Sequence, residues 1–206
     1  QVELIQRWGY PAERHEVTTQ DGYILDFFRI PQGRNGTRAG SRPAILLMHG
    51  LLASSTQWIW NLPDQSAAYI YADAGLDVFL ANVRGTTYGR RHRTLDPDQQ
   101  EFWNFSFDEM ARYDLPAIID RALAISGQDQ LYYMGHSQGT LIASLMLADR
   151  PRYNGKVKSI FMLSPVATGH FMRGPIQLVL SAYSILWPFG EVWRHVVGSR
   201  EVLSKD

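Results

Sequence analysis

The chain of 206 residues contains no cysteine, so disulfide bonds are excluded from its fold. A domain of this length buries enough apolar surface to be stable without them. An excess of charge of one sign is also missing, because 20 basic residues balance 20 acidic residues and the formal net charge is zero. We therefore expect no nucleic-acid partner, since a neutral surface suits an uncharged substrate.

Long hydrophobic runs are absent as well. The longest apolar stretch, residues 176–189, is shorter than the ~20 residues that a membrane-spanning helix needs, so we expect no transmembrane segment. The chain begins at Gln1 without a charged and then apolar leader, and any signal peptide is expected to lie outside this sequence. Nothing in the pattern of residues calls for a metal ion or an organic cofactor.

Basic residues are concentrated in one place only. They are Arg84 and the run Arg90, Arg91, His92 and Arg93. A cluster of this size is more often solvated or ion-paired than a binding patch, and we interpret it as such a face.

A serine between two glycines is the most informative feature that is present. The string Gly135-His136-Ser137-Gln138-Gly139 follows the apolar run 131–134 and precedes the helix-forming run 140–149. A G-x-S-x-G string between a strand and a helix is typical of a nucleophile elbow, which holds the serine in a strained turn above a sheet edge. Ser137 is therefore a predicted nucleophile.

The neighbours of this serine have structural roles in the same interpretation. Gly135 and Gly139 let the strand and the helix approach where a Cβ atom would clash. His136 is expected to be a packing residue of the elbow.

A second motif could supply the oxyanion donors that a nucleophilic serine requires. Residues 44–48 form a short apolar run that predicts a buried strand, and His49-Gly50-Leu51-Leu52 follows. The oxyanion formed by serine attack needs donors, for which the backbone N–H groups of Leu51 and Gln138 are the candidates. Gln138 also opens a helix, whose positive end favours an anion. We expect His49 to hydrogen-bond its own turn.

The remaining pattern alternates between strands and helices. A helix over 108–125 should begin at a capping box of Ser106 and Glu109 and bend at Pro116. The predicted strands are 16–19, 23–30, 44–48, 77–81, 131–134 and 157–163. About six strands in a mostly parallel sheet with crossover helices predict an α/β-hydrolase core.

Several motifs together resemble the acid lipase family, which includes gastric and lysosomal acid lipases. They cover most of the chain up to about residue 167, in the order of the family: Gly9-Tyr10-Pro11, residues 17–25, residues 49–55, Asn82-Val83-Arg84-Gly85, Arg90-Arg91-His92, residues 107–111, residues 113–116 and the elbow. The resemblance implies Ser137 as nucleophile and Leu51 and Gln138 as oxyanion donors. It also implies a lipid ester substrate, a triacylglycerol or cholesteryl ester, met at a lipid–water interface.

The acid and the histidine of a triad are harder to find. In α/β-hydrolases they follow the serine on later loops. Asp149 lies about 18 Å along the helix from Ser137, and Glu191 and His195 are spaced as a surface pair on one helix. His170 is the remaining candidate base.

This gap is expected if the chain is the N-terminal portion of a longer lipase, or a truncated gene product. Residues 1–167 would form the hydrolase core, truncated before its last two strands. Residues 168–206 are amphipathic and aromatic and would begin a helical cap over the active site.

Two N-glycosylation sequons begin at Asn35 and Asn104, in agreement with a secreted or lysosomal glycoprotein. Two other functions stay open. The chain is compatible with another serine acyl hydrolase, such as a thioesterase or a peptidase. It is also compatible with a catalytically incomplete fragment that binds lipid or a partner.

Overall fold

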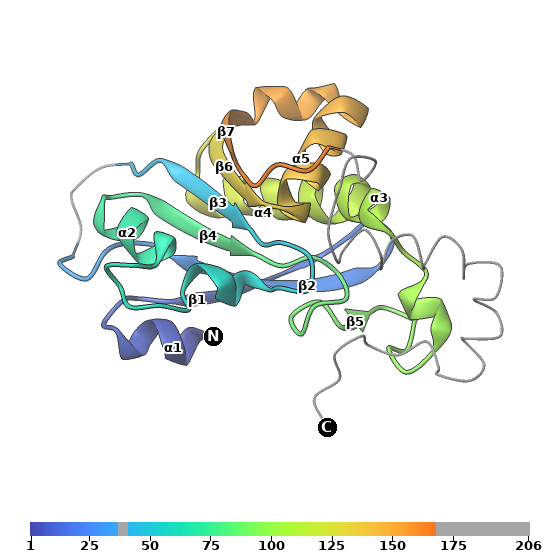
Figure 1. The fold of residues 1–206 in the computed structure, drawn as a ribbon, viewed down its shortest axis with the longest axis horizontal. Helices are drawn as coiled ribbons and strands as arrows, with labels where there is room; N and C mark the ends of the chain where they lie inside the picture. Colours follow the sequence, from blue (N-terminus) through green and yellow to red (C-terminus); the bar gives the residue numbers. More distant parts are fainter. Residues whose placement is uncertain (37–40, 168–206) are drawn as a thin grey trace.

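A computed structural model describes residues 1–36 and 41–167 of the chain. Its centre is a seven-stranded sheet of order β1-β2-β4-β3-β6-β7, with β5 paired to β2 (Figure 1). The strands are β1 (Glu13–Thr18), β2 (Tyr23–Ile30), β3 (Ala44–Met48), β4 (Asp77–Ala81), β5 (Arg91–His92), β6 (Leu131–His136) and β7 (Val157–Leu163). The neighbours β4, β3, β6 and β7 run parallel, whereas β1, β2 and β5 pair antiparallel.

Helices and helical turns connect these strands. The α-helices are α1 (Val2–Arg7), α2 (Ala67–Asp73), α3 (Phe107–Glu109), α4 (Leu115–Ser126) and α5 (Gln138–Asp149). The short turns are the 3₁₀ segments η1 (Ser55–Trp58), η2 (Gln100–Trp103) and η4 (Pro151–Gly155), and the π-helical turn η3 (Met110–Asp114). Figure 1 shows α1 and α5 on opposite sides of the sheet.

Side chains of β3 and β4 alternate between two hydrophobic clusters. Leu46 and Phe79 belong to a cluster that includes residues of α4 and α5. Ile45 and Val78 belong to a second cluster, which includes residues of α1, η1 and α2. Because helices cover both faces, these central strands are apolar throughout, which is why the sequence predicted their limits correctly.

The predicted α/β-hydrolase core with a mostly parallel sheet is confirmed, with corrections to its strands. The described residues contain seven strands rather than about six, because the two-residue β5 is too short to leave a periodic pattern. The first strand begins at Glu13 rather than at residue 16, and β6 continues to His136 rather than ending at residue 134.

The predicted helix over 108–125 is interrupted by a change of hydrogen-bonding pattern. The capping box of Ser106 and Glu109 is present as predicted. The bend expected at Pro116 takes the form of the π-helical turn η3, after which α4 begins with Pro116 in its first turn. Proline donates no hydrogen bond and its ring crowds the carbonyl four residues earlier, so a wider turn accommodates it.

The π-helical turn ends at Asp114, which forms a buried ion pair with Arg84. The carboxylate accepts hydrogen bonds from Arg84 N at 2.9 Å, Nε at 2.9 Å and Nη2 at 2.7 Å. Asp21 accepts from Nη1 at 2.6 Å, and the guanidinium carbon lies 3.9 Å from the ring centroid of Tyr23. Burial opposes the charge of Arg84, but the two carboxylates raise its pKa above the ordinary value.

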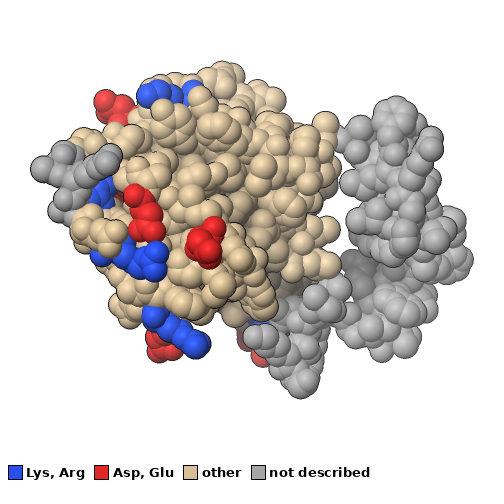
Figure 2. Space-filling model, turned by 60° about the vertical axis from the view of Figure 1, so that its left-hand side comes forward, with Lys and Arg blue, Asp and Glu red and all other residues tan. Residues whose placement is uncertain are grey.

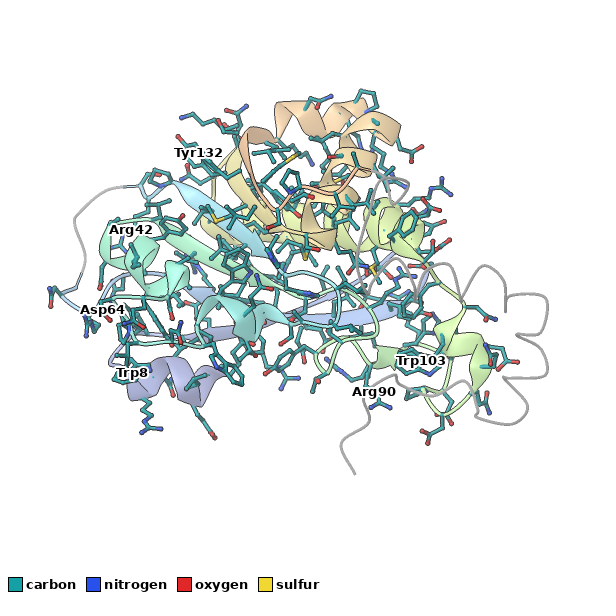
Figure 3. The ribbon with its side chains drawn as sticks, viewed as in Figure 1. Trp8, Arg42, Asp64, Arg90, Trp103 and Tyr132 are labelled. Carbon is teal, nitrogen blue, oxygen red and sulfur yellow. The ribbon has the colours of Figure 1, made fainter. Side chains whose placement is uncertain are left out.

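The basic cluster is therefore not one solvated face, because Arg84 is only 2% exposed. The ion-paired interpretation is confirmed for Arg91, which pairs with Glu16 at 2.7 Å and Asp26 at 2.8 Å. Arg90 lies over the ring of Trp103 at 5.7 Å from its centroid (Figure 3). Figure 2 shows basic and acidic side chains adjoining one another on one face, where much of the remaining surface is uncharged.

Strand β7 lies at the edge of the sheet in the described part of the chain, paired with β6. Its apolar residues Phe161, Met162 and Leu163 are 46%, 42% and 43% exposed. Within residues 1–36 and 41–167 no further strand extends the sheet beyond β7. No helix in these ranges has the length and apolarity to cross a membrane.

We predict that Asp114→Ala lowers the free energy of unfolding by about 3 to 5 kcal/mol, because it leaves part of the buried guanidinium of Arg84 unpaired. Urea unfolding followed by circular dichroism measures this change. Asp129→Ala, which removes an exposed acid, is the matched control and should stay within about 0.5 kcal/mol of the wild type. Equal losses in the two variants would contradict the prediction.

Candidate active site

Ser137 occupies the sharp turn between β6 and α5. Its backbone angles are φ 50° and ψ −113°, in a region that residues with a side chain rarely adopt. The turn is held from both sides: Ser137 N donates to Leu163 O at 2.9 Å, and Thr140 N donates to Ser137 O at 2.9 Å. This strained serine between a strand and a helix has the geometry of the predicted nucleophile elbow.

The two glycines of the elbow lie where no side chain fits. A Cβ atom on Gly139 would lie 2.8 Å from Met48 O and 2.9 Å from His49 O. A Cβ atom on Gly135 would lie 2.7 Å from the carbonyl carbon of Gly139. Because all these neighbours are backbone atoms, they cannot rotate away, and the approach of α5 to β6 and β3 requires glycine at both positions.

The turn after β3 contacts the elbow directly. A Cβ atom on Gly50 would lie 3.3 Å from Ser137 Cβ and 2.8 Å from His136 Nδ1. The predicted strand-end motif and the predicted elbow are therefore side by side. Leu51 follows Gly50 in this turn, and Gln138 is the first residue of α5, at its positive end. Their roles as oxyanion donors stay predictions that this arrangement favours.

His49 is buried and uses both ring nitrogens in hydrogen bonds. Nδ1 donates to Gly50 O at 2.8 Å, and Nε2 accepts from Val83 N at 3.4 Å. The expectation that His49 hydrogen-bonds its own turn is confirmed. Burial lowers the pKa of the imidazole to about 4, with the bond to Gly50 opposing that shift, so the ring is neutral at pH 7.

In the described part of the chain no histidine hydrogen-bonds the side chain of Ser137. His136 lies close to Gly50, and its Nδ1 is buried without a partner; its role as a packing residue of the elbow stays a prediction. Asp149 ends α5 and approaches Arg112 Nε at 3.6 Å, so it does not take part in the site. The candidate base His170, the pair Glu191 and His195, and the expected cap region 168–206 lie outside the described residues.

Sequence reasoning overlooked one residue beside the site. Asn82 follows β4 and is fully buried, and its Oδ1 accepts a hydrogen bond from Ser55 N, which follows the turn after β3. Asn82 stood within one of the motifs that carry the family resemblance, but nothing in its local pattern signals a contact with a residue 27 positions earlier.

Large apolar side chains are exposed beside the elbow and just after η1. Leu51 and Leu52 are 62% and 69% exposed, and Trp60 and Leu62 are 77% and 50% exposed. Leu52 also has a positive φ of 58°, which a leucine rarely adopts. Exposed apolar side chains of this size are candidates for a surface that meets an apolar ligand or partner.

Comparison with protein families identifies the fold family of the chain. The family described as alpha/beta hydrolase fold matches residues 43–185, and the one described as partial alpha/beta-hydrolase lipase region matches residues 1–62. The chain belongs to the α/β-hydrolase fold family. Within it, the resemblance to the acid lipases is confirmed by the relatives that the chain matches.

These relatives are lipases of two animals. The chain is 51% identical to gastric triacylglycerol lipase of Homo sapiens, over 85% of the chain and 44% of that protein. It is 45% identical to the lipase lipl-1 of Caenorhabditis elegans, over 99% of the chain and 50% of that protein. The chain thus spans about half the length of the curated relatives it matches.

Solved structures show the same fold at lower sequence identity. The naproxen esterase of Bacillus subtilis is 20% identical, with a TM-score of 0.52 over 89% of this chain and 52% of that one. The epoxide hydrolase VrEH1 of Vigna radiata is 19% identical, with a TM-score of 0.52 over 85% of this chain and 44% of that one. At these identities the likeness establishes the fold alone.

We predict that Gly139→Ala lowers the free energy of unfolding by about 1 to 3 kcal/mol, because the added methyl group forces α5 away from β3. Chemical denaturation measures the loss. Gly155→Ala is the matched control, since a Cβ atom there meets nothing within 4 Å. If Gly139→Ala is as stable as Gly155→Ala, the close approach is not required.

The buried His49 predicts a loss of stability in acid. Above about pH 6.5 the imidazole is neutral in both states and contributes no pH dependence. As the pH falls from about 6.5 to about 4, the unfolded state binds a proton that the folded state excludes, so the free energy of unfolding decreases by on the order of 3 kcal/mol. Denaturation of the wild type and His49→Gln between about pH 7 and pH 4 measures this difference. Parallel pH profiles for the two proteins would contradict the prediction.

Proposed function

We propose that the protein carrying this chain is a serine ester hydrolase, a lipase that acts on neutral lipid esters such as triacylglycerols or cholesteryl esters. The observation that carries the proposal is the strained Ser137 between β6 and α5, in contact with Gly50 of the turn after β3. The lipases among the relatives support the same assignment.

In the proposed reaction, Ser137 Oγ attacks the acyl carbon of the ester while its proton passes to a base. The carbonyl oxygen becomes an anion that accepts hydrogen bonds from the backbone N–H groups of Leu51 and Gln138. The ester C–O bond then breaks, and the alcohol leaves with the proton. Water attacks the acyl-serine in the second half, which releases the fatty acid and restores the serine.

The base in this proposal comes from outside the described residues. His49 cannot serve, because both of its ring nitrogens are engaged in hydrogen bonds. The acid and the histidine follow the serine in α/β-hydrolases, which places them after Ser137. His170 is one candidate for the base.

The exposed side chains of Leu51, Leu52, Trp60 and Leu62 suit a surface that meets the lipid–water interface. An ester carried in a lipid phase would reach Ser137 past this surface. In the same proposal, residues 168–206 begin the cap that covers the site and excludes water.

A secreted or lysosomal location fits the two sequons. The side chains of Asn35 and Asn104 are both exposed, so glycans at these positions would extend into solvent. We propose them as glycosylation sites.

The exposed apolar surface also suits a second function, a catalytically incomplete module that binds lipid or a partner. A thioesterase or peptidase with the same elbow is the third alternative. The lipase, the thioesterase and the peptidase differ in the substrates that they hydrolyse, and the binding module hydrolyses none. One set of activity measurements therefore separates them.

We predict that an organophosphonate ester probe labels Ser137 in the complete protein that carries this sequence, and that peptide mass mapping places the adduct there. Ser137→Ala should lower hydrolysis of a short-chain aryl ester by on the order of 10⁴-fold or more, because the nucleophile is lost. Ser144→Ala removes an exposed serine of α5 and is the matched control, which should keep both labelling and turnover.

Substrate comparison decides between the alternatives. A lipase should hydrolyse emulsified triacylglycerol or cholesteryl ester faster than thioesters and peptides. Turnover of thioesters or peptides alone would favour another acyl hydrolase. Lipid binding without labelling or turnover would favour the binding module, and labelling elsewhere with Ser137 unmodified would reject the nucleophile.

A further inference from the structure

Asn82 is a polar residue buried between three parts of the fold. It follows β4 directly, and none of its surface is exposed. Its Oδ1 accepts a hydrogen bond from Ser55 N at 2.8 Å, and its Nδ2 donates to Asp26 O on β2 at 3.1 Å. The amide therefore joins β2, the end of β4 and the chain that follows the turn after β3, with both ends of its side chain satisfied.

The turn that Asn82 holds carries Leu51, the candidate oxyanion donor. Inside the turn, the bonds from Ala53 N to Gly50 O and from Gly50 N to Gln57 Oε1 are long, at 3.3 Å each, and the short bond from His49 Nδ1 to Gly50 O, at 2.8 Å, lies at its start. Two of its side chains, those of Leu51 and Leu52, lie largely in solvent and supply little packing. The turn therefore depends on contacts at its two ends for a fixed conformation.

Both ends of this turn are tied to the same short segment after β4. At the start the bond is long, since His49 Nε2 accepts from Val83 N at 3.4 Å. At the end, Ser55 N donates to Asn82 Oδ1. The next residue of that segment, Arg84, is fixed by its ion pair with Asp114, so the segment is a rigid support.

We propose that Asn82 is a positioning residue for the oxyanion hole, which it serves by fixing the far end of the turn that carries the Leu51 N–H. The inference rests on the proposed function. Asn82 does not touch the substrate and acts through the bond to Ser55. A donor displaced by about 1 Å loses much of its effect on the transition state, on the order of 100-fold in rate, although substrate binding changes little.

Two variants break this bond from opposite sides in the complete protein. Asn82→Ala removes the acceptor. Ser55→Pro removes the donor at the first position of η1 and displaces the Asn82 amide with its ring, and the preceding Ser54 already has the extended conformation that proline requires, with φ −141° and ψ 178°. It also removes the Ser55 hydroxyl, which donates to Gln1 Oε1 at 2.7 Å, so Ser55→Ala, which keeps the N–H and loses only that hydroxyl, is its control. Val78→Ala is the matched control: it removes buried methyl groups from β4 at a site in the second hydrophobic cluster.

The measurements are kcat and KM for a soluble aryl ester, the inhibition constant of an arylboronic acid, and the Tm of each variant. The boronic acid adds to the serine and places an oxygen in the oxyanion hole, so it reports transition-state binding. In both bond-breaking variants kcat should fall roughly 10- to 100-fold, whereas KM should stay within about threefold of the wild type. The inhibition constant of the boronic acid should rise by about the same factor by which kcat falls. Val78→Ala should lower Tm and leave kcat unchanged.

Three results would overturn the inference. They are kcat within about twofold of the wild type in either bond-breaking variant, a rise in KM without a fall in kcat, and a loss of kcat that Val78→Ala reproduces at an equal loss of Tm. A different result would be that the wild-type protein shows no turnover, or turnover that Ser137→Ala does not abolish. That result rejects the proposed function, and the inference is rejected with it.

Discussion

The close approach of α5 to the end of β3 is the constraint on which the candidate site depends. At Gly139 only a hydrogen atom fits between the helix and the carbonyl groups of Met48 and His49. Tyr133 reinforces this approach from β6, since its buried hydroxyl donates to Gly139 O at 2.7 Å. With the helix this near, Ser137 is forced into its strained conformation beside the turn after β3. The proposed nucleophile Ser137 and the turn that carries the proposed oxyanion donor Leu51 are thus brought together by the same close approach of α5 to β3.

Buried polar groups hold the turn after β3 in place. The Arg84–Asp114 pair holds the segment after β4, and that segment holds both ends of the turn after β3 through Asn82 and His49. Each of these groups is taken out of water and keeps hydrogen-bond partners in the protein, which fixes one conformation at a cost in desolvation. A site that must keep backbone donors within a fraction of an ångström needs such a support.

The described core also exposes apolar surface in two places with different meanings. Leu51 and Leu52 lie in the turn beside the elbow and Trp60 and Leu62 follow η1, and under the proposed function these side chains would meet a lipid surface. The exposed residues of β7 belong to a sheet edge, where an unpaired strand invites pairing with another strand. The relatives that the chain matches are about twice as long as this chain, and in the proposed reaction the acid and the base follow Ser137.

The sequence by itself determined the elements whose signals are local. The apolar runs of β3 and β4, the capping box at Ser106 and the glycines around Ser137 could be read directly, because burial on both faces, helix capping and a strained turn each demand particular residue types in a short stretch. Tertiary structure alone decided the contacts between distant segments. In the sequence Arg84 belongs to a basic cluster, whereas in the structure it is buried and pairs with the buried Asp114 and with Asp21. Asn82 and its partner Ser55 are likewise brought together only by the pairing of β3 with β4. Such pairings depend on packing across the sheet, which leaves no periodic or local pattern in the chain.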